Sequence, residues 1–345
     1  MANEKASTAL LEARAFLKDS NNKKFEMRKE KTNILSGFMQ DREFTIPALQ
    51  AIRKAEKQLT KVEYATRKAF TIGTEKSCAP SGETAGSGIS TVAWSQKNFT
   101  IQIREKMYQN NDINRAQGIA NDLWEGEKSL FLGANGVDAA LLAYLEANKT
   151  QVNALSAGGG HNSWNAALNQ VEVANADINR YYDYMQPEME MNNYDGTILD
   201  FTNTIWRSEW NHYVNQGSGN NVNTAYQFND IDLKLSKLIV PTGYNKHVHY
   251  HVPVGGVAFL DWNDPLNLAG RVAGEKEWGT YESIMFPGLF FDTLTTYGCA
   301  DTTDDGGAKQ DLVTNIEFTL NYAPVTQPFS VANESAIFKY VNLNA

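Results

Sequence analysis

The sequence predicts an α+β protein, with helices concentrated in the first half of the chain and short strands in the second. Three observations lead to this class. Residues 113–148 carry apolar positions at helical spacing, and residues 98–104 alternate apolar and polar side chains. From about residue 192 the pattern of residues is that of short strands and turns. Helices followed by strands favour an α+β arrangement over an alternating α/β one.

The N-terminal part is predicted to be helical over residues 5–40 and again over 46–70. In the second stretch, apolar residues recur every three, four or seven positions, with Thr45 as a candidate N-cap and Pro47 in the first turn. The following residues, 71–90, are rich in Gly, Ser and Thr and cannot hold a regular element without partners.

A short strand is expected next, because Phe99, Ile101 and Ile103 alternate with polar residues. A strand of this kind at a sheet edge tends to pair with another chain. Two helices are then predicted, over 113–131 and 138–148, since each carries a stripe of leucines and other apolar residues.

The second half combines predicted strands with two further helices. The helices are expected at 164–183 and 206–214. The strands are expected at 198–201, 231–240, 248–259 and 312–322.

Composition indicates a globular protein with an uneven charge distribution. A chain of 345 residues with 42% hydrophobic content can bury a large core in one elaborate domain or in two to three ordinary ones. Residues 1–70 hold 15 Lys/Arg against 9 Asp/Glu, a net +6, within a chain whose net charge is −9. This basic segment is either a solvated helix surface or an arm that faces a polyanion or an acidic neighbouring subunit.

Signals for secretion or membrane insertion are not expected. The first 20 residues lack the apolar centre of a signal peptide, and no run approaches the roughly 18 apolar residues of a membrane helix. Two cysteines, Cys78 and Cys299, do not make a disulfide framework, so free thiols in a reducing cytoplasm are expected.

Three histidines form the most specific candidate for a metal site. His247, His249 and His251 alternate with other residues, so on a strand their imidazoles share one face, as a metal would need. A cupin-type site would also require a Glu a few residues later, where Val252-Pro-Val-Gly-Gly stands instead. The favoured interpretation is a strand whose polar side faces solvent or an interface, and no metal is predicted.

Evidence for an enzyme is weak. The acidic stretch 301–305 lacks the ligand spacing of an EF-hand, so no calcium site is predicted. A glycosidase acid–base pair with tryptophan sugar platforms is an open alternative, among Glu190, Asp195, Glu209 and Asp261 with Trp206, Trp210 and Trp262. No nucleophile elbow, phosphate loop or dinucleotide fingerprint occurs, so no catalytic residue, cofactor or enzymatic activity is predicted.

Several phrases of the chain carry a resemblance. Ser129-Leu-Phe-Leu-Gly-Ala-Asn-Gly136 ends one predicted helix and opens the next, after a Gly/Ser-rich stretch and a strand. This order resembles the major capsid protein of tailed bacteriophages, with its Hong Kong 97-type fold. Residues 215–228, 252–259 and 310–318 also resemble capsid proteins of phages that infect Bacteroidetes-type hosts, including the crAss-like group.

The resemblance implies a division of the chain into the parts of that fold. These are an N-terminal helical arm at 1–70, an extended hairpin loop at 71–105, a long spine helix with the peripheral domain at 106–195, an axial domain at 196–310, and a C-terminal strand returning to the peripheral domain at 311–345. The first 70 residues look more regularly helical than a typical arm of the family.

It also implies a function: a structural protein that assembles with itself, as hexamers and pentamers, into an icosahedral virion shell around double-stranded DNA. The DNA would be bound nonspecifically, and portal, scaffold and decoration proteins are further candidate partners. Assembly would take place in the host bacterial cytoplasm, without a membrane. Phe99, Ile101 and Ile103 are the predicted intersubunit anchors, and Arg67 and Lys68 the predicted polar contacts.

Two alternatives to this function stay open at the sequence level. One is a different virion protein, such as a tail component or a jelly-roll capsid subunit, although the helical first half argues against a jelly roll. The other is a carbohydrate-active enzyme or binding module, suggested by the abundance of Trp, Tyr, Asn and Asp.

Overall fold

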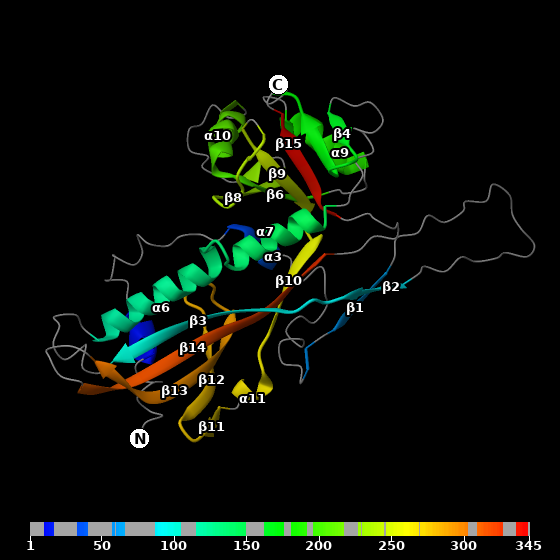
Figure 1. Ribbon diagram of the computed structural model, residues 1–345. Helices are drawn as coiled ribbons and strands as arrows, with labels where there is room; N and C mark the ends of the chain where they lie inside the picture. Colours follow the sequence, from blue (N-terminus) through cyan, green and yellow to red (C-terminus); the bar gives the residue numbers. More distant parts are fainter. Residues whose placement is uncertain are drawn as a thin grey trace, which may run out of the picture.

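The computed structural model combines helices with two large β-sheets, which confirms the predicted mixture of helix and strand. It describes residues 10–16, 33–40, 57–58, 60–65, 87–104, 115–149, 162–175, 181–191, 196–216, 227–228, 230–244, 246–268, 270–302, 309–326 and 336–343. Figure 1 shows one sheet alongside a long helical element and the other sheet on the opposite side of that element, near one end.

The first sheet has six strands, all antiparallel, in the order β10-β14-β13-β12-β11, with β3 also paired to β14. Its strands are β3 (Ser95–Arg104), β10 (Val257–Trp262), β11 (Arg271–Ala273), β12 (Lys276–Glu282), β13 (Phe290–Thr302) and β14 (Lys309–Thr326). The great length of β14 organises the sheet, because β13 and β10 pair with successive parts of one edge of it while β3 pairs with its other edge.

The second sheet has seven strands in the order β4-β5-β15-β9-β6-β8-β7. They are β4 (Ser163–Asn165), β5 (Gln170–Val173), β6 (Ile198–Asn203), β7 (Gln227–Phe228), β8 (Ile231–Ser236), β9 (Val248–Pro253) and β15 (Phe338–Asn342). β5 with β15 and β6 with β8 are parallel, and the other pairs are antiparallel. Every residue of β6 and of β15 is buried, so these central strands are covered on both faces.

The chain passes from the second sheet to the first between Pro253 and Val257. The single strand expected at 248–259 is therefore wrong: it is two strands, β9 and β10, that belong to different sheets. Gly255 explains the break, because its φ of 89° is a conformation that residues with a Cβ rarely adopt. The strands of residues 257–302 consequently lie with β14, and the assignment of peripheral and axial roles to the two sheets stays a prediction.

The predicted helical pair is confirmed as α6 (Arg115–Leu132) and α7 (Val137–Ala147). α6 lies along β3, and α7 continues toward the seven-stranded sheet (Figure 1). The junction requires glycine at Gly136, where a Cβ would lie 2.7 Å from the carbonyl oxygen of Leu130. This pair of helices therefore connects the two sheets.

Residues Ala116–Ala147 also meet the length and composition test for a membrane span, with a mean hydropathy of 1.2 in the window tested. In the structure they are two helices, and their apolar residues join the main core, among them Leu123, Phe131 and Leu141. Packing within the chain thus accounts for part of the apolar composition of this stretch, since 39% of the window is buried.

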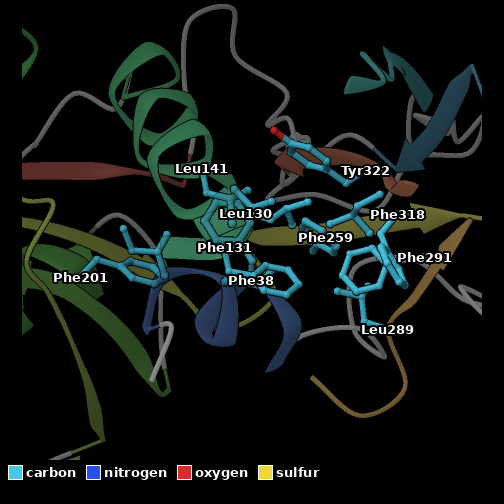
Figure 2. Packing of buried hydrophobic residues seen from close by; sticks show 14 of the residues in the cluster. Phe38, Leu130, Phe131, Leu141, Phe201, Phe259, Leu289, Phe291, Phe318 and Tyr322 are labelled. Atoms are coloured by element: carbon cyan, nitrogen blue, oxygen red, sulfur yellow. The ribbon is translucent and has the colours of Figure 1, made fainter. Parts of the chain in front are cut away.

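One continuous core joins the two sheets across these helices. Phe38, on α3 (Asn33–Gln40), lies between Tyr144 of α7 and Phe201 of β6, with ring centroids 6.4 and 6.1 Å away. Figure 2 shows Phe38 near the middle of the cluster, with Phe201 on one side and Phe291 on the other. The short N-terminal helix α3 therefore holds the helical pair against the seven-stranded sheet.

The helix predicted over 46–70 is wrong at its end. Residues Lys61–Ala65 form strand β1, which pairs antiparallel with β2 (Ser87–Thr91), while residues 46–56 lie outside the described part of the chain. Lys61-Val-Glu-Tyr fits the alternation of a strand as well as the spacing of a helix. Pairing with a distant segment makes it a strand. Of the helix expected over 5–40, residues 10–16 and 33–40 are described and helical.

The helix predicted over 164–183 is also wrong, because residues 163–173 form the hairpin β4–β5. Its turn is built by side-chain chemistry: Oδ1 of Asn165 accepts hydrogen bonds from the backbone N–H groups of Ala167 and Leu168, at 3.1 and 3.2 Å. Asn169 then takes the left-handed φ of 48° that closes the turn. A helix, α9 (Tyr181–Met191), begins only at the end of the predicted range. The helix expected at 206–214 is confirmed as α10 (Arg207–Gln216), preceded by the 3-10 turn η2 (Thr204–Trp206).

Candidate functional site: assembly elements and a buried polar cluster

The hairpin β1–β2 stands apart from both sheets. Its strands pair from Lys61 with Thr91 to Ala65 with Ser87, and Val92 donates a backbone hydrogen bond to the Thr60 oxygen (3.0 Å) at its base. Within the described residues, neither strand pairs with any strand outside the hairpin. Figure 1 shows it beyond the ends of β10 and β14. Because an isolated two-stranded hairpin is marginally stable in water, this element needs a surface to lie on.

Strand β3 supplies part of the core of its own subunit. Ile101 and Ile103 are only 6% and 3% exposed, and the partly buried ring of Phe99 stacks on Phe318 with centroids 4.8 Å apart. The Phe99 ring also lies where a Cβ on Gly126 of α6 would come within 2.4 Å. That these three side chains also contact a neighbouring subunit stays a prediction, and Phe99 is the one that retains accessible surface.

The other face of β3 is polar, and there the Asn98 amide donates a hydrogen bond to the Glu317 carboxylate (3.1 Å). Gln96 and Gln102 donate side-chain hydrogen bonds to Asn321 (2.7 Å) and Asn315 (3.1 Å) on β14. The strand edge opposite β14 pairs with no described strand. A ten-residue strand with one open edge is a ready site for pairing with another chain.

The predicted polar contacts Arg67 and Lys68 lie outside the described residues. Within the basic N-terminal segment, Arg14 forms an ion pair with Glu282 and lies over the Tyr281 ring, 5.8 Å from its centroid. At this position the segment contacts an acid of its own chain.

Helix α6 is fixed to the first sheet by a buried carboxylate that the sequence did not single out. The Glu127 side chain is 0% exposed and accepts hydrogen bonds from the Ser283 hydroxyl (2.7 Å) and from the backbone N–H groups of Ile284 and Met285 (3.0 Å each). Burial raises the pKa of Glu127, and these donors act against that rise.

The three alternating histidines are all 0% exposed, so the interpretation that they form a solvent-facing side is wrong. Both faces of β9 are covered: Val248, Tyr250 and Val252 belong to the core shared with the helical pair, while the histidine side meets α9 and η2. Alternation with apolar residues could not reveal this, because it describes two faces without saying what covers each.

The acid at the centre of this cluster is Asp200 of β6, which the sequence analysis missed. Nδ1 of His249 lies 2.8 Å from its Oδ1, and Nε2 of His251 lies 3.2 Å from the same oxygen. Burial alone would raise the pKa of Asp200, but the charges and hydrogen bonds of the two histidines outweigh it and hold that pKa well below its usual range. Burial lowers the pKa of His249, with Asp200 opposing the change. An Asp within Ile198-Leu-Asp-Phe201, an otherwise apolar strand, was the available signal.

Aromatic residues enclose the cluster. Tyr182 donates its hydroxyl to Oδ2 of Asp200 (2.6 Å) and accepts from Nε1 of Trp206 (2.7 Å). The Tyr181 hydroxyl lies 2.9 Å from Nε2 of His251. The ring centroid of His247 lies 4.3 Å from that of Trp206. Burial lowers the pKa of His247 to about 2, and the nearby His249 acts in the same direction.

These positions remove the sugar-platform interpretation of two tryptophans, because Trp206 and Trp210 are 1% and 2% exposed. Asp261, one of the candidate acids, is 2% exposed in β10 of the six-stranded sheet, whereas these tryptophans lie on η2 and α10 and pack with residues of the seven-stranded sheet. Asp195 lies outside the described residues, as do Cys78 and residues 303–308 of the acidic stretch. Cys299 is a free and exposed thiol.

Comparison with known proteins yields matches among solved structures. No protein-family model and no curated protein matches the chain. A structure described as Mycobacterium phage Che8 is 10% identical with a TM-score of 0.47, over 82% of this chain and 85% of that one. One described as Mycobacterium phage Cain is 11% identical with a TM-score of 0.44, over 92% of each chain. The asymmetric unit of the bacteriophage PhiM1 mature capsid is 11% identical with a TM-score of 0.44, over 84% of each. Likeness at this level assigns no family, so function has to follow from the geometry of the chain itself.

Proposed function

We propose that this protein is a structural capsid subunit of the Hong Kong 97 type, which assembles with copies of itself into an icosahedral phage shell around double-stranded DNA. The observation that carries the proposal is the hairpin β1–β2, paired internally and with no other strand among the described residues. A neighbouring subunit is the surface that would stabilise it, because a two-stranded hairpin alone is marginal.

The arrangement of the other elements supports this proposal. The hairpin leads through residues 92–94 into β3, β3 lies against the long helix α6, and α7 reaches the second sheet (Figure 1). The order of hairpin, strand and long helix supports the extended loop and spine helix that the sequence resemblance implies, and the peripheral and axial domains are part of the proposal. A rigid body with a projecting element suits head-to-tail contacts, which close into rings when the rotation between subunits allows it.

In such a shell the hairpin would lie over the next subunit, and the open edge of β3 would be available for strand pairing. Hexamers and pentamers would then use the same contact with slightly different angles. DNA would be held without sequence preference by basic side chains of residues 1–70, so its retention should fall steeply with salt. Portal, scaffold and decoration proteins are the further partners that we propose for assembly in the host cytoplasm.

The register of the hairpin allows a clean test. Val92 donates its backbone N–H to the Thr60 oxygen, so residues 61–91 can be replaced by an Asn-Gly turn that this hydrogen bond closes. The wild-type protein should form rings, tubes or closed shells in negative-stain electron microscopy and light scattering. The shortened protein should keep its thermal unfolding transition and stay monomeric.

Two results would count against the proposal. Normal shells from the shortened variant would remove the assembly role of the hairpin. A wild-type protein that stays monomeric across salt and concentration, and also when expressed together with its phage's portal and scaffold proteins, would contradict a shell subunit altogether.

A further inference from the structure

The polar cluster between the seven-stranded sheet and helix α9 has the composition of a metal site. Asp200 on β6 and His251 on the adjacent β9 are direct cross-strand partners, and His249 lies one step further along β9 on the same face. Their candidate donor atoms all lie within 4.8 Å of one another, and all three side chains are 0% exposed. Backbone pairing therefore fixes the positions of these donors before any ligand binds.

The donors select one class of metal. Two imidazoles with one carboxylate are typical ligands of zinc and its first-row neighbours, whereas Ca²⁺ and Mg²⁺ prefer oxygen ligands throughout. Ligand atoms around a tetrahedral Zn²⁺ lie about 3.4 Å apart, given bonds of roughly 2.1 Å. The present distances from Oδ1 of Asp200 are 2.8 Å to Nδ1 of His249 and 3.2 Å to Nε2 of His251, so a spread of a few tenths of an ångström would bring these pairs to that spacing.

Outer contacts orient the carboxylate as they do in protein metal sites. Tyr182 holds Oδ2 of Asp200 at 2.6 Å, and Trp206 holds the Tyr182 hydroxyl at 2.7 Å. Such outer partners set the direction of a ligand and typically change metal affinity 10- to 100-fold when removed. The Tyr181 hydroxyl, 2.9 Å from Nε2 of His251, places one further oxygen beside the three donors.

Hydrogen bonds within the protein leave this cluster incomplete. Nε2 of His249, Nδ1 of His251 and both ring nitrogens of His247 are buried and have no hydrogen-bond partner in the described part of the chain. Buried polar atoms are nearly always paired, and exceptions point to an ion or a water. On His249 and His251 these atoms are the ring nitrogens opposite the ones that face Asp200, so water would pair them, while the metal would use Nδ1 of His249 and Nε2 of His251.

We propose that Asp200, His249 and His251 bind a divalent first-row transition metal, with Zn²⁺ the expected ion, at a structural site inside this domain. The metal would tie β6 to β9 beneath α9. Because the donors are fully buried, the ion would enter during folding rather than afterwards.

The test measures metal content in the full-length protein. The protein is unfolded with a chelator, refolded with Zn²⁺ or Co²⁺, and desalted. We expect one metal per chain by elemental analysis, visible absorption bands of four-coordinate Co²⁺, and an increase in Tm over protein refolded with chelator. Substoichiometric metal, with no Co²⁺ bands, would overturn the proposal.

Two variants separate this site from adventitious binding. His249→Ala/His251→Ala should lose the metal, whereas His161→Gln/His212→Gln, which changes the two histidines outside the 247–251 segment, should keep one equivalent. Equal metal in the first variant and in the wild type would mean an adventitious ion only. If the first variant does not fold, X-ray absorption of the Co²⁺-loaded wild type decides the question, since two imidazoles per metal are expected and fewer would contradict the site.

Discussion

The two sheets of this protein bury their interiors in different ways. Around the six-stranded sheet, the core is a set of aromatic and aliphatic side chains, with Phe99, Phe291 and Phe318 in contact through their rings. On one face of the seven-stranded sheet, Asp200 and the histidines occupy equally buried positions and depend on hydrogen bonds. Stability in the first region depends on shape and volume, whereas in the second it depends on how many of the buried polar atoms find partners.

The largest effect should come from the apolar side of this comparison. Phe318→Ala removes a ring that is 0% exposed and stacked on Phe99. We expect a loss of about 3–5 kcal/mol in the free energy of unfolding, from lost burial and the cavity left behind. Leu312→Ala, on the same strand but 68% exposed, should change stability by less than about 0.5 kcal/mol. Urea unfolding of both variants checks this, and equal losses would show that β14 is not held by its buried face.

A matched pair of tyrosines compares the two regions directly. Tyr182→Phe removes the donor to Asp200 and leaves Nε1 of Trp206 without its 2.7 Å partner, so we expect a loss of about 2–4 kcal/mol. Tyr281→Phe removes a buried hydroxyl that has no hydrogen-bond partner among the described residues, so it should be neutral or slightly stabilising. Equal costs for the two changes, measured by thermal and urea unfolding, would remove the distinction between the regions.

The same contrast explains how much the sequence could predict. Helices α6 and α7 were predictable because their apolar spacing is local, and the strand containing Ile101 and Ile103 was predictable for the same reason. β1 was not, since its strand character depends on Ser87–Thr91, more than twenty residues away.

The polar cluster shows where local pattern ends. Alternation placed His247, His249 and His251 on one face, as the structure has them, but their burial is decided by α9 and η2, which are distant in the sequence. The pairing of Asp200 with His251 is likewise set by strand order, and no spacing rule joins two residues 51 positions apart.

A third prediction concerns pH, at the junction between the two regions. Oδ1 of Asp138 in α7 accepts a hydrogen bond from the backbone N–H of Leu35 in α3 (3.0 Å), and burial raises its pKa to about 7. The folded state therefore binds a proton more tightly than the unfolded state, so stability should fall as pH rises from about 4 to 7 and then level off. Asp138→Asn keeps an acceptor but cannot ionise.

At pH 8, Asp138→Asn should therefore be more stable than the wild type, by at most about 4 kcal/mol, and the two should converge near pH 4. Burial also raises the pKa of Glu127, so part of the pH dependence should persist in the variant. Urea unfolding at a series of pH values checks this. A variant that is less stable than the wild type at pH 8 would show that the Asp138 carboxylate is needed in its charged form.

The smallest effect should come from the contact between α6 and β3. Gly126→Ala improves helix propensity by about 1 kcal/mol, but its Cβ would lie 2.4 Å from the Phe99 ring. Overpacking of a filled core costs about 1–3 kcal/mol, so we expect a net loss of about 1 kcal/mol in thermal unfolding. The double variant Gly126→Ala/Phe99→Leu should lose less than the two single variants added together, because the smaller side chain makes room for the methyl group. Additive losses would mean that helix and strand can separate without cost, and Phe99 would then be free to serve a neighbouring subunit.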